Sequence, residues 1–374
     1  MPRSGIRVIL DEANKVGNVL HLEIGQPDFP TPPHIIEAAA KAAYDGYTGY
    51  TPNAGYPSLR EAFASRLKSD HGLDLPAEQV VVSVGAMGAL FNAFCTTLSP
   101  GDEVLLPDPG YPNYVMTVQL LGARFIPYPL DVTPNGYSLN YEAIRSRITE
   151  RTKVIVINSP SNPTGLVASG EVLQELVKLA QAHGLYILSD EAYDHIIFEG
   201  AHVSPLSFDE SGCVIATYSC SKTYSMTGWR IGFTVASPTI APIATKLQEA
   251  YVSCAPSVSQ KAAEVALNGP QTCVKEMVAT YGRRRQIALE LCRDLGIQCI
   301  PPKGAFYLMI ALPEAAKSDS MGFALRLVKE AHIAVAPGVT FGTKGEGHVR
   351  LSLCSSEETI REGLNRLATV YQQF

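Results

Sequence analysis

One lysine, Lys222, stands where α/β proteins commonly carry out chemistry. The apolar residues 214–218 predict a buried strand, and Lys222 follows shortly after that strand. Reactive groups of α/β sheets gather at the carboxyl ends of the strands. Burial there lowers the pKa of an amine, and a neutral amine can condense with an aldehyde. Ser219 and Arg230 flank the lysine and are suited to an anion such as a phosphate. The pattern predicts a Schiff-base lysine beside a phosphate site, with a solvated loop lysine as the ordinary alternative.

A second reactive position is Asp190, which directly follows the apolar strand predicted over residues 185–189. Tyr193 comes three residues later. A carboxylate at the end of a buried strand is unfavourable unless it meets a positive partner. The acids could instead form a metal cluster of Asp190, Glu191, Asp194 and His195. No second ligand group of suitable spacing is apparent in the sequence, so no metal site is expected.

A strand, a glycine turn and a helix follow one another over residues 80–97. The free N–H groups and the positive end of such a helix favour phosphate. The turn Gly-Ala-Met-Gly is neither a dinucleotide fingerprint nor a P-loop.

Three further polar positions follow or occupy predicted strands. Tyr111 lies in a proline-rich turn after residues 103–106 and is suited to a stacking wall for a flat ring. Asn162 follows the strand at 153–157, where Asn-Pro can also simply begin a turn. Arg350 stands among apolar residues at 348–353, which favours an anionic partner such as a carboxylate. The alternative for Arg350 is a place on the solvent face of its strand.

Two motifs carry a resemblance to a known family. Residues 219–232 read Ser-x-Ser-Lys-x-Tyr-x-Met-x-Gly-Trp-Arg-Ile-Gly, and residues 162–165 read Asn-Pro-Thr-Gly. Both resemble the signatures of class I/II aminotransferases, which are fold-type I pyridoxal-phosphate (PLP) enzymes. The resemblance extends from Gly25 to the last helix, with the motifs in family order.

The resemblance implies a role for each matching residue. Lys222 would form the Schiff base with PLP and move the substrate's α-proton. Asp190 would pair with the pyridine nitrogen, Tyr111 would stack on the ring, and Tyr193 and Asn162 would bond the phenolic oxygen. The phosphate would be held by the backbone N–H groups of Ala86 and Met87, by the side chains of Ser219 and Arg230, and by Tyr50 from the partner subunit of a homodimer. The substrate carboxylate would be bound by Gly25, Asn162 and Arg350.

Alternating strands and amphipathic helices independently predict an α/β fold with a doubly wound, mostly parallel sheet. We expect a large PLP-binding domain over residues 46–284. A smaller α+β domain would comprise residues 1–45, with an N-terminal arm, and residues 285–374. Within these domains we expect a helix over 33–44, a helix over 58–68 with a Ser58–Glu61 capping box, and a last helix capped by Ser355 with Glu358.

Composition excludes several function classes. The 374 residues carry a formal net charge of -6 and give no basic surface for nucleic acid. No apolar run reaches the length of a membrane span, and residues 1–11 lack the apolar core of a signal peptide. The eight cysteines are scattered singly, which favours reduced thiols in a cytoplasmic enzyme.

The expected function is therefore PLP-dependent transfer of an amino group between an L-amino acid and a 2-oxo acid by a ping-pong mechanism. In an aspartate-specific bacterial branch of the family, a lysine at the position of Met87 helps to bind the distal carboxylate. Methionine here makes aspartate less favoured than alanine, aromatic or other apolar substrates. A PLP-dependent lyase or cyclase on the same fold stays open as an alternative. A non-catalytic PLP-binding regulator is disfavoured, because the N-terminal arm is too short for a DNA-binding segment.

Overall fold

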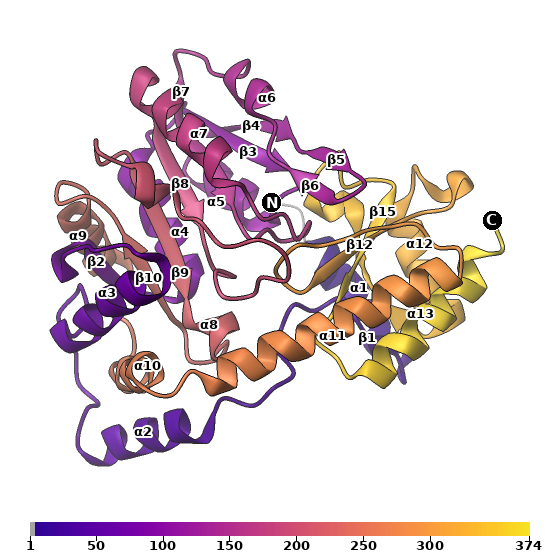
Figure 1. The fold of residues 1–374 in the computed structure, drawn as a ribbon, viewed down its shortest axis with the longest axis horizontal. Coiled ribbons are helices and arrows are strands. Elements are labelled where there is room, and N and C mark those ends of the chain that lie inside the picture. Colours follow the sequence, from indigo (N-terminus) through magenta and orange to yellow (C-terminus); the bar gives the residue numbers. More distant parts are fainter. Residues whose placement is uncertain (1–3) are drawn as a thin grey trace.

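The computed structural model describes residues 4–374, so Met1, Pro2 and Arg3 of the expected N-terminal arm lie outside the described residues. A seven-stranded sheet forms the larger lobe (Figure 1). Only β10 runs antiparallel to its neighbours among these strands. The strand order is β2 (Val80–Val84), β10 (Ile231–Val235), β9 (Val214–Ser219), β8 (Tyr186–Asp190), β7 (Thr152–Asn158), β3 (Glu103–Asp108) and β4 (Arg124–Pro129). The predicted mostly parallel sheet is confirmed.

Helices cover both faces of this sheet, because its strands direct apolar side chains to both faces. In β7, Val154 and Val156 pack towards α4 and α5, whereas Ile155 and Ile157 pack towards α7. The helices of this lobe are α2 (Pro33–Tyr44), α3 (Pro57–His71), α4 (Gly85–Thr97), α5 (Pro112–Leu120), α6 (Tyr141–Arg145), α7 (Gly170–His183), α8 (Cys220–Thr223), α9 (Ala241–Tyr251) and α10 (Ser257–Asn268). A small hairpin of β5 (Asp131–Thr133) and β6 (Gly136–Ser138) completes it. The fold is therefore doubly wound.

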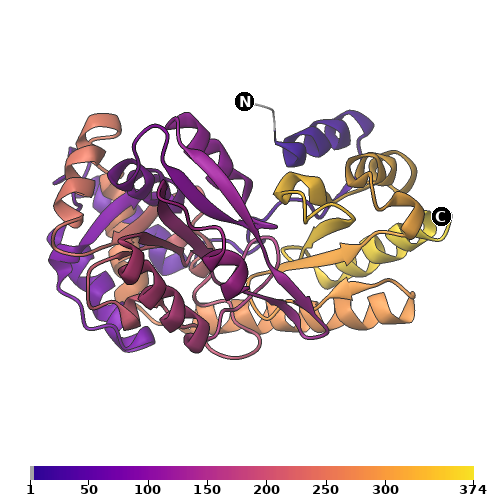
Figure 2. The same cartoon turned by 90° about the horizontal axis from the view of Figure 1, so that it is seen from above.

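The smaller lobe is built on an antiparallel sheet of four strands (Figure 2). Their order is β11 (Cys299–Ile300), β12 (Tyr307–Ala311), β15 (His348–Ser352) and β14 (Ala336–Pro337). Its helices are α11 (Thr272–Asp294), α12 (Ser320–Arg326), continued by a π-helical turn (Leu327–Ala331), and α13 (Glu357–Tyr371). The predicted α+β character of this region agrees with the structure.

The N-terminal segment is more regular than the arm expected from sequence. Residues 5–16 form the helix α1 (Gly5–Val16), which packs on the small lobe through Ile9 and Ala13. A short strand, β1 (Leu20–His21), then pairs in parallel with β13 (Ile333–Ala334). Both elements therefore fasten the segment that leads into Gly25.

The domain boundaries stay a prediction. The proposed division at residue 284 falls inside α11, which runs from one lobe to the other (Figure 1). The expected helix at 33–44 is confirmed as α2, and it packs against α10 of the large lobe. On α11, Arg284 makes a two-pronged ion pair with Asp28, at 2.8 and 2.7 Å.

Two predicted helix caps are wrong. α3 begins at Pro57 after Tyr56, and the Ser58 hydroxyl donates to Glu264 instead of capping the helix. The last helix is capped by Ser356, whose hydroxyl oxygen accepts from the Thr359 amide, one residue later than expected. Among residues 4–374, no helix is both long and apolar enough to cross a membrane.

Candidate active site

A cavity of about 500 Å³ opens at the carboxyl edge of the large sheet, beside the small lobe. Residues from α4, β8, α8, β15 and the segment after β1 line it. All predicted site residues except Tyr50 lie on its wall. Tyr50 is instead 92% exposed in a loop outside the cavity. Segments far apart in the sequence thus converge where the resemblance predicted a site.

Lys222 lies on α8, a single turn that begins directly after β9. Its Nζ donates a hydrogen bond of 2.6 Å to the carbonyl oxygen of Gly25. Burial lowers the pKa of the amine to about 8, and the positive charges of Arg350 and Arg230 act in the same direction. The amine is therefore far easier to deprotonate than an ordinary lysine.

Gly25 must be a glycine at this position. A Cβ atom on its backbone would lie 1.8 Å from the hydroxyl oxygen of Tyr307. The same residue carries the carbonyl oxygen that accepts from Lys222. A side chain here would push the segment away from the lysine.

The phosphate site predicted from sequence has the required geometry. α4 begins at Gly85, so the backbone N–H groups of Ala86 and Met87 lie in its first turn, where no helical carbonyl accepts from them. Arg230 approaches the same turn so closely that a Cβ on Gly85 would lie 2.6 Å from its Nη2. Ser219 caps α8 by accepting a bond of 3.1 Å from the Ser221 amide. Positive charge and free donors therefore meet at one end of the cavity.

Asp190 ends β8 and is almost completely buried. The Tyr114 hydroxyl donates to its Oδ2 at 2.5 Å, and the Ala192 amide donates to its Oδ1 at 3.2 Å. Burial raises the pKa of Asp190 to about 6 despite these two donors. A cationic partner in the cavity would hold this carboxylate in its charged form.

Arg350 enters the cavity from β15 of the small lobe and is 2% exposed. Its Nη1 donates to Asn162 Oδ1 at 2.8 Å, and its Nη2 donates to the Glu23 carbonyl at 2.5 Å. The guanidinium also stacks 4.1 Å from the centre of the Tyr307 ring. Its buried Nε has no hydrogen-bond partner among the described residues. Arg350 thus has donor capacity left for an anion. The alternative prediction, that Arg350 lies on the solvent face of its strand, is wrong.

Two aromatic residues complete the predicted set. Tyr111 lines the cavity and meets Tyr114 edge to face, with ring centres 5.5 Å apart. The Tyr193 hydroxyl shares a hydrogen bond of 2.9 Å with the Tyr307 hydroxyl. Tyr114 packs in the core of the large lobe, and its hydroxyl also donates to Asp190.

Sequence reasoning missed several residues of the site. Tyr307 comes from β12, and no motif marks it among the apolar residues of that strand. Asn158, whose Oδ1 accepts from the Asn162 amide, stands just ahead of a motif that did draw attention. Ile6, Arg7 and Leu10 line the cavity from α1, a helix that an amphipathic pattern over residues 5–16 could have revealed.

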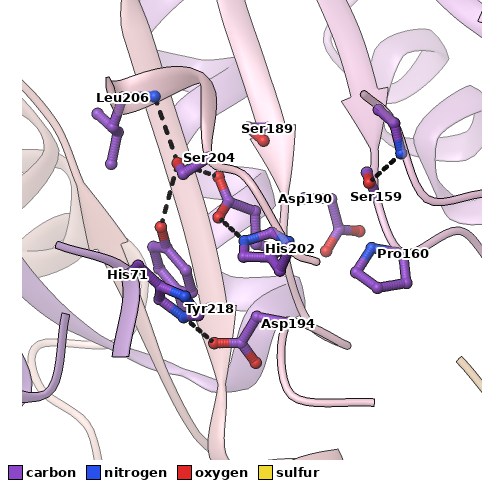
Figure 3. Close-up of polar contacts among 12 residues, drawn as sticks. His71, Ser159, Pro160, Ser189, Asp190, Asp194, His202, Ser204, Leu206 and Tyr218 are labelled. Carbon is purple, nitrogen blue, oxygen red and sulfur yellow. Dashed lines mark hydrogen bonds and ion pairs between the residues drawn. The ribbon is translucent and has the colours of Figure 1, made fainter. Parts of the chain in front are cut away.

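The alternative metal cluster of four residues does not form as postulated. Asp190 lines the cavity, whereas Glu191 bonds His202 at 2.7 Å. Asp194 turns towards His71, which lies on α3, and Asp190 points away from that pair (Figure 3). Asp190 therefore belongs to the cavity alone.

Comparisons with known proteins agree with this geometry. The family model described as "Aminotransferase class I and II" matches residues 17–367. A probable N-acetyl-LL-diaminopimelate aminotransferase of Bacillus subtilis is 38% identical over 97% of this chain and 92% of its own. An aspartate aminotransferase of Pyrococcus horikoshii is 38% identical over 98% of this chain and 94% of its own. The solved alanine aminotransferase of Pyrococcus furiosus superposes with a TM-score of 0.95 at 30% identity, covering 100% of this chain and 98% of its own.

The chain belongs to the class I and II aminotransferases and has the α/β fold of these enzymes. It is therefore an aminotransferase of a PLP-dependent family. The named relatives act on different amino acids, so the family alone does not specify the substrate.

Proposed function

We propose that this aminotransferase binds PLP in the 500 Å³ cavity and uses Lys222 to transfer an amino group from an L-amino acid to a 2-oxo acid. The observation that carries this is that the Lys222 amine, the Asp190 carboxylate and the Arg350 guanidinium line one cavity. There Lys222 would act as the base, Asp190 would pair with the ring nitrogen, and Arg350 would bind the substrate carboxylate. Bound PLP would supply the electron sink for the reaction.

The residues on the wall fit this cofactor. The N–H groups at the start of α4, with Arg230 and Ser219, suit its phosphate. Burial disfavours the charged form of Asp190 unless a cation lies beside it, so this carboxylate suits a protonated ring nitrogen. Tyr111 offers its ring as a wall, and Tyr193 and Asn162 offer polar groups to the phenolic oxygen.

Lys222 is proposed to move the substrate's α-proton. Its lowered pKa, about 8, keeps a sizeable neutral fraction of the amine near neutral pH. The Gly25 carbonyl, 2.6 Å from Nζ, orients the amine towards the cavity. Lys222 would therefore act as base and then as acid on the same face of the substrate.

The substrate's α-carboxylate would bind Arg350 and Asn162, which already face each other at 2.8 Å. The side-chain end of the cavity is bounded by apolar residues, including Met87, Ile6 and Leu10, which suits alanine, aromatic and other apolar amino acids. Arg7, which is exposed, also lines this cavity. Arg7 would give the same site a cation for a dicarboxylic substrate, which Met87 cannot supply.

We further propose a homodimer in which Tyr50 reaches the phosphate of the neighbouring subunit. Tyr50 is 92% exposed although it is a large aromatic residue. Tyr44, on α2, has the same exposure, and Ile36 on that helix is 45% exposed. Exposed apolar side chains on a helix and on the loop that follows it favour a covering partner.

Product analysis tests the reaction type. The PLP-loaded protein is incubated with single amino acids and 2-oxoglutarate or pyruvate, and all products are measured. Transamination predicts equal amounts of new oxo acid and new amino acid, without ammonia. Release of ammonia from the donor, without a matching amount of new amino acid, would favour the lyase alternative, and a cyclic product would favour the cyclase.

A further inference from the structure

Two Asp-His dipeptides meet behind the active site. Asp70 and His71 end α3, and Asp194 and His195 follow β8. His71 Nε2 lies 3.2 Å from Asp194 Oδ2, and His195 Nε2 lies 3.6 Å from the same oxygen. Figure 3 shows His71 and Asp194 pointing at each other, with His202 and Tyr218 close by. No second ligand group for Asp194 and His195 is apparent in the sequence, but α3 supplies one in His71.

The three atoms have the spacing of metal ligands. His71 Nε2, Asp194 Oδ2 and His195 Nε2 all lie within 4.8 Å of one another. Zinc binds histidine nitrogen and carboxylate oxygen at about 2.1 Å, and a tetrahedron of that size separates its ligands by about 3.4 Å. The two separations from Asp194 Oδ2, 3.2 and 3.6 Å, lie on either side of that value.

The surroundings provide space for a small ligand. A cavity of about 20 Å³ is lined by Asp70, His71, Asp194 and His195. A cavity of that size holds about one water molecule, which could serve as a fourth ligand of a metal ion. The side chains of His71 and Asp194 are only 8% and 9% exposed, so bulk water does not saturate them.

The charge balance also favours a cation. Three carboxylates lie in this cluster, those of Asp70, Asp194 and Glu191. One guanidinium opposes them, because Arg66 pairs with Asp70 at 2.6 Å. With neutral imidazoles the cluster therefore has two uncompensated negative charges, which either two protons or one divalent cation would balance.

We propose that His71, Asp194 and His195 bind one zinc ion. Two imidazoles and one carboxylate are a ligand set that zinc accepts, with water completing the tetrahedron. Arg66 would stay bonded to Asp70 outside the ligand shell and orient that carboxylate beside His195. The ion joins the end of α3 to the loop after β8.

The position of the ion suggests its role. Ser219, Cys220 and Thr223 line the same small cavity, and they belong to the turn that presents Lys222. The ion supports this turn from behind and takes no part in the chemistry. Its removal is expected to loosen α8 and α3 together, so thermal stability falls more than the turnover of the folded enzyme.

Metal content of the untagged PLP-loaded enzyme tests the proposal. After incubation with zinc sulfate and gel filtration, we expect about one zinc per chain. His71→Asn and His195→Gln should each lose at least about 90% of that zinc. His202→Gln is the matched control, because His202 is buried beside His71 but bonds Glu191 instead. It should keep its zinc.

A thermal melt separates loss of metal from loss of fold. Zinc should raise the Tm of the wild type and of His202→Gln, but leave the Tm of folded His195→Gln unchanged. The His195 side chain is 23% exposed and that of His71 is 8% exposed, so His195→Gln should disturb the fold less than His71→Asn. Wild-type protein that retains no zinc overturns the proposal, and so does zinc retained at the wild-type level by His71→Asn and His195→Gln.

Discussion

The guanidinium of Arg350 donates a hydrogen bond of 2.8 Å to Asn162 Oδ1, and this contact joins the small lobe to the carboxyl edge of the large sheet. Arg350 comes from β15, whereas Asn162 follows β7. A second bond, to the Glu23 carbonyl, fixes the same side chain to the segment that carries Gly25. Three separate parts of the chain therefore orient the group that we assign to the substrate carboxylate.

Replacing Arg350 with lysine tests this assignment. Lysine keeps the charge but loses the planar fork that matches a carboxylate, so we expect kcat/KM to fall roughly 100-fold, mainly through KM. Steady-state kinetics with several amino acids measure this change. PLP affinity serves as the control and should stay within about threefold, because no phosphate contact is altered. An unchanged KM would show that the carboxylate binds elsewhere.

Asp190→Asn should make the PLP-free protein more stable and the PLP complex weaker. The pKa of Asp190 rises from 3.8 to about 6 on folding, so its ionised form destabilises the native state above that range. We expect asparagine to add on the order of 2 kcal/mol at pH 7, after allowing for one weakened hydrogen bond. The advantage should vanish towards pH 4, where the carboxyl group is protonated in the folded state and partly protonated in the unfolded state, so that the weakened hydrogen bond offsets the small remainder. Denaturant melts at the two pH values check the sign, and an advantage at pH 4 alone would contradict it.

The pH dependence of PLP uptake tests Lys222. Only the neutral amine reacts with an aldehyde, so the uptake rate of the PLP-free protein should rise with pH and level off above about 8. Stopped-flow absorbance provides the rates. A rate that keeps rising to pH 10 would mean that Lys222 titrates as an ordinary exposed lysine.

Arg7 is expected to influence the choice between dicarboxylic and apolar substrates. Arg7→Met should lower kcat/KM for aspartate or glutamate at least about tenfold, while leaving alanine or phenylalanine within about twofold. Lys15→Met is the matched control, since Lys15 stands on the same helix, pairs with Glu12 and is 73% exposed. Equal losses for both substrate classes would assign Arg7 a structural role.

The sequence predicted those site residues that follow strands in recognisable motifs. Asp190 ends an apolar strand, Lys222 and Asn162 follow such strands within a few residues, and the carboxyl ends of neighbouring strands meet at one edge. Family resemblance added Gly25 and favoured a substrate carboxylate as the anionic partner of Arg350, and Tyr307 lies close to both residues.

The rest depended on tertiary contacts that no local pattern reveals. Tyr114 and Tyr307 look like ordinary core residues until their hydroxyl groups are seen to reach Asp190 and Tyr193. The Ser58 cap failed because α3 begins one residue earlier, at Pro57, so Ser58 lies inside the first turn and its hydroxyl donates to Glu264. His71 joined Asp194 only because α3 ends beside the loop after β8.

An absorbance titration of the purified protein tests the central claim most directly. PLP is added, and the spectrum is followed while single amino acids are titrated in. We predict that visible absorption appears in the wild type, then gives way to a near-ultraviolet band as certain amino acids are converted to their oxo acids. Lys222→Ala should show neither the wild-type band nor this conversion. Absence of any visible band with added PLP, or full transamination by Lys222→Ala, would contradict the account.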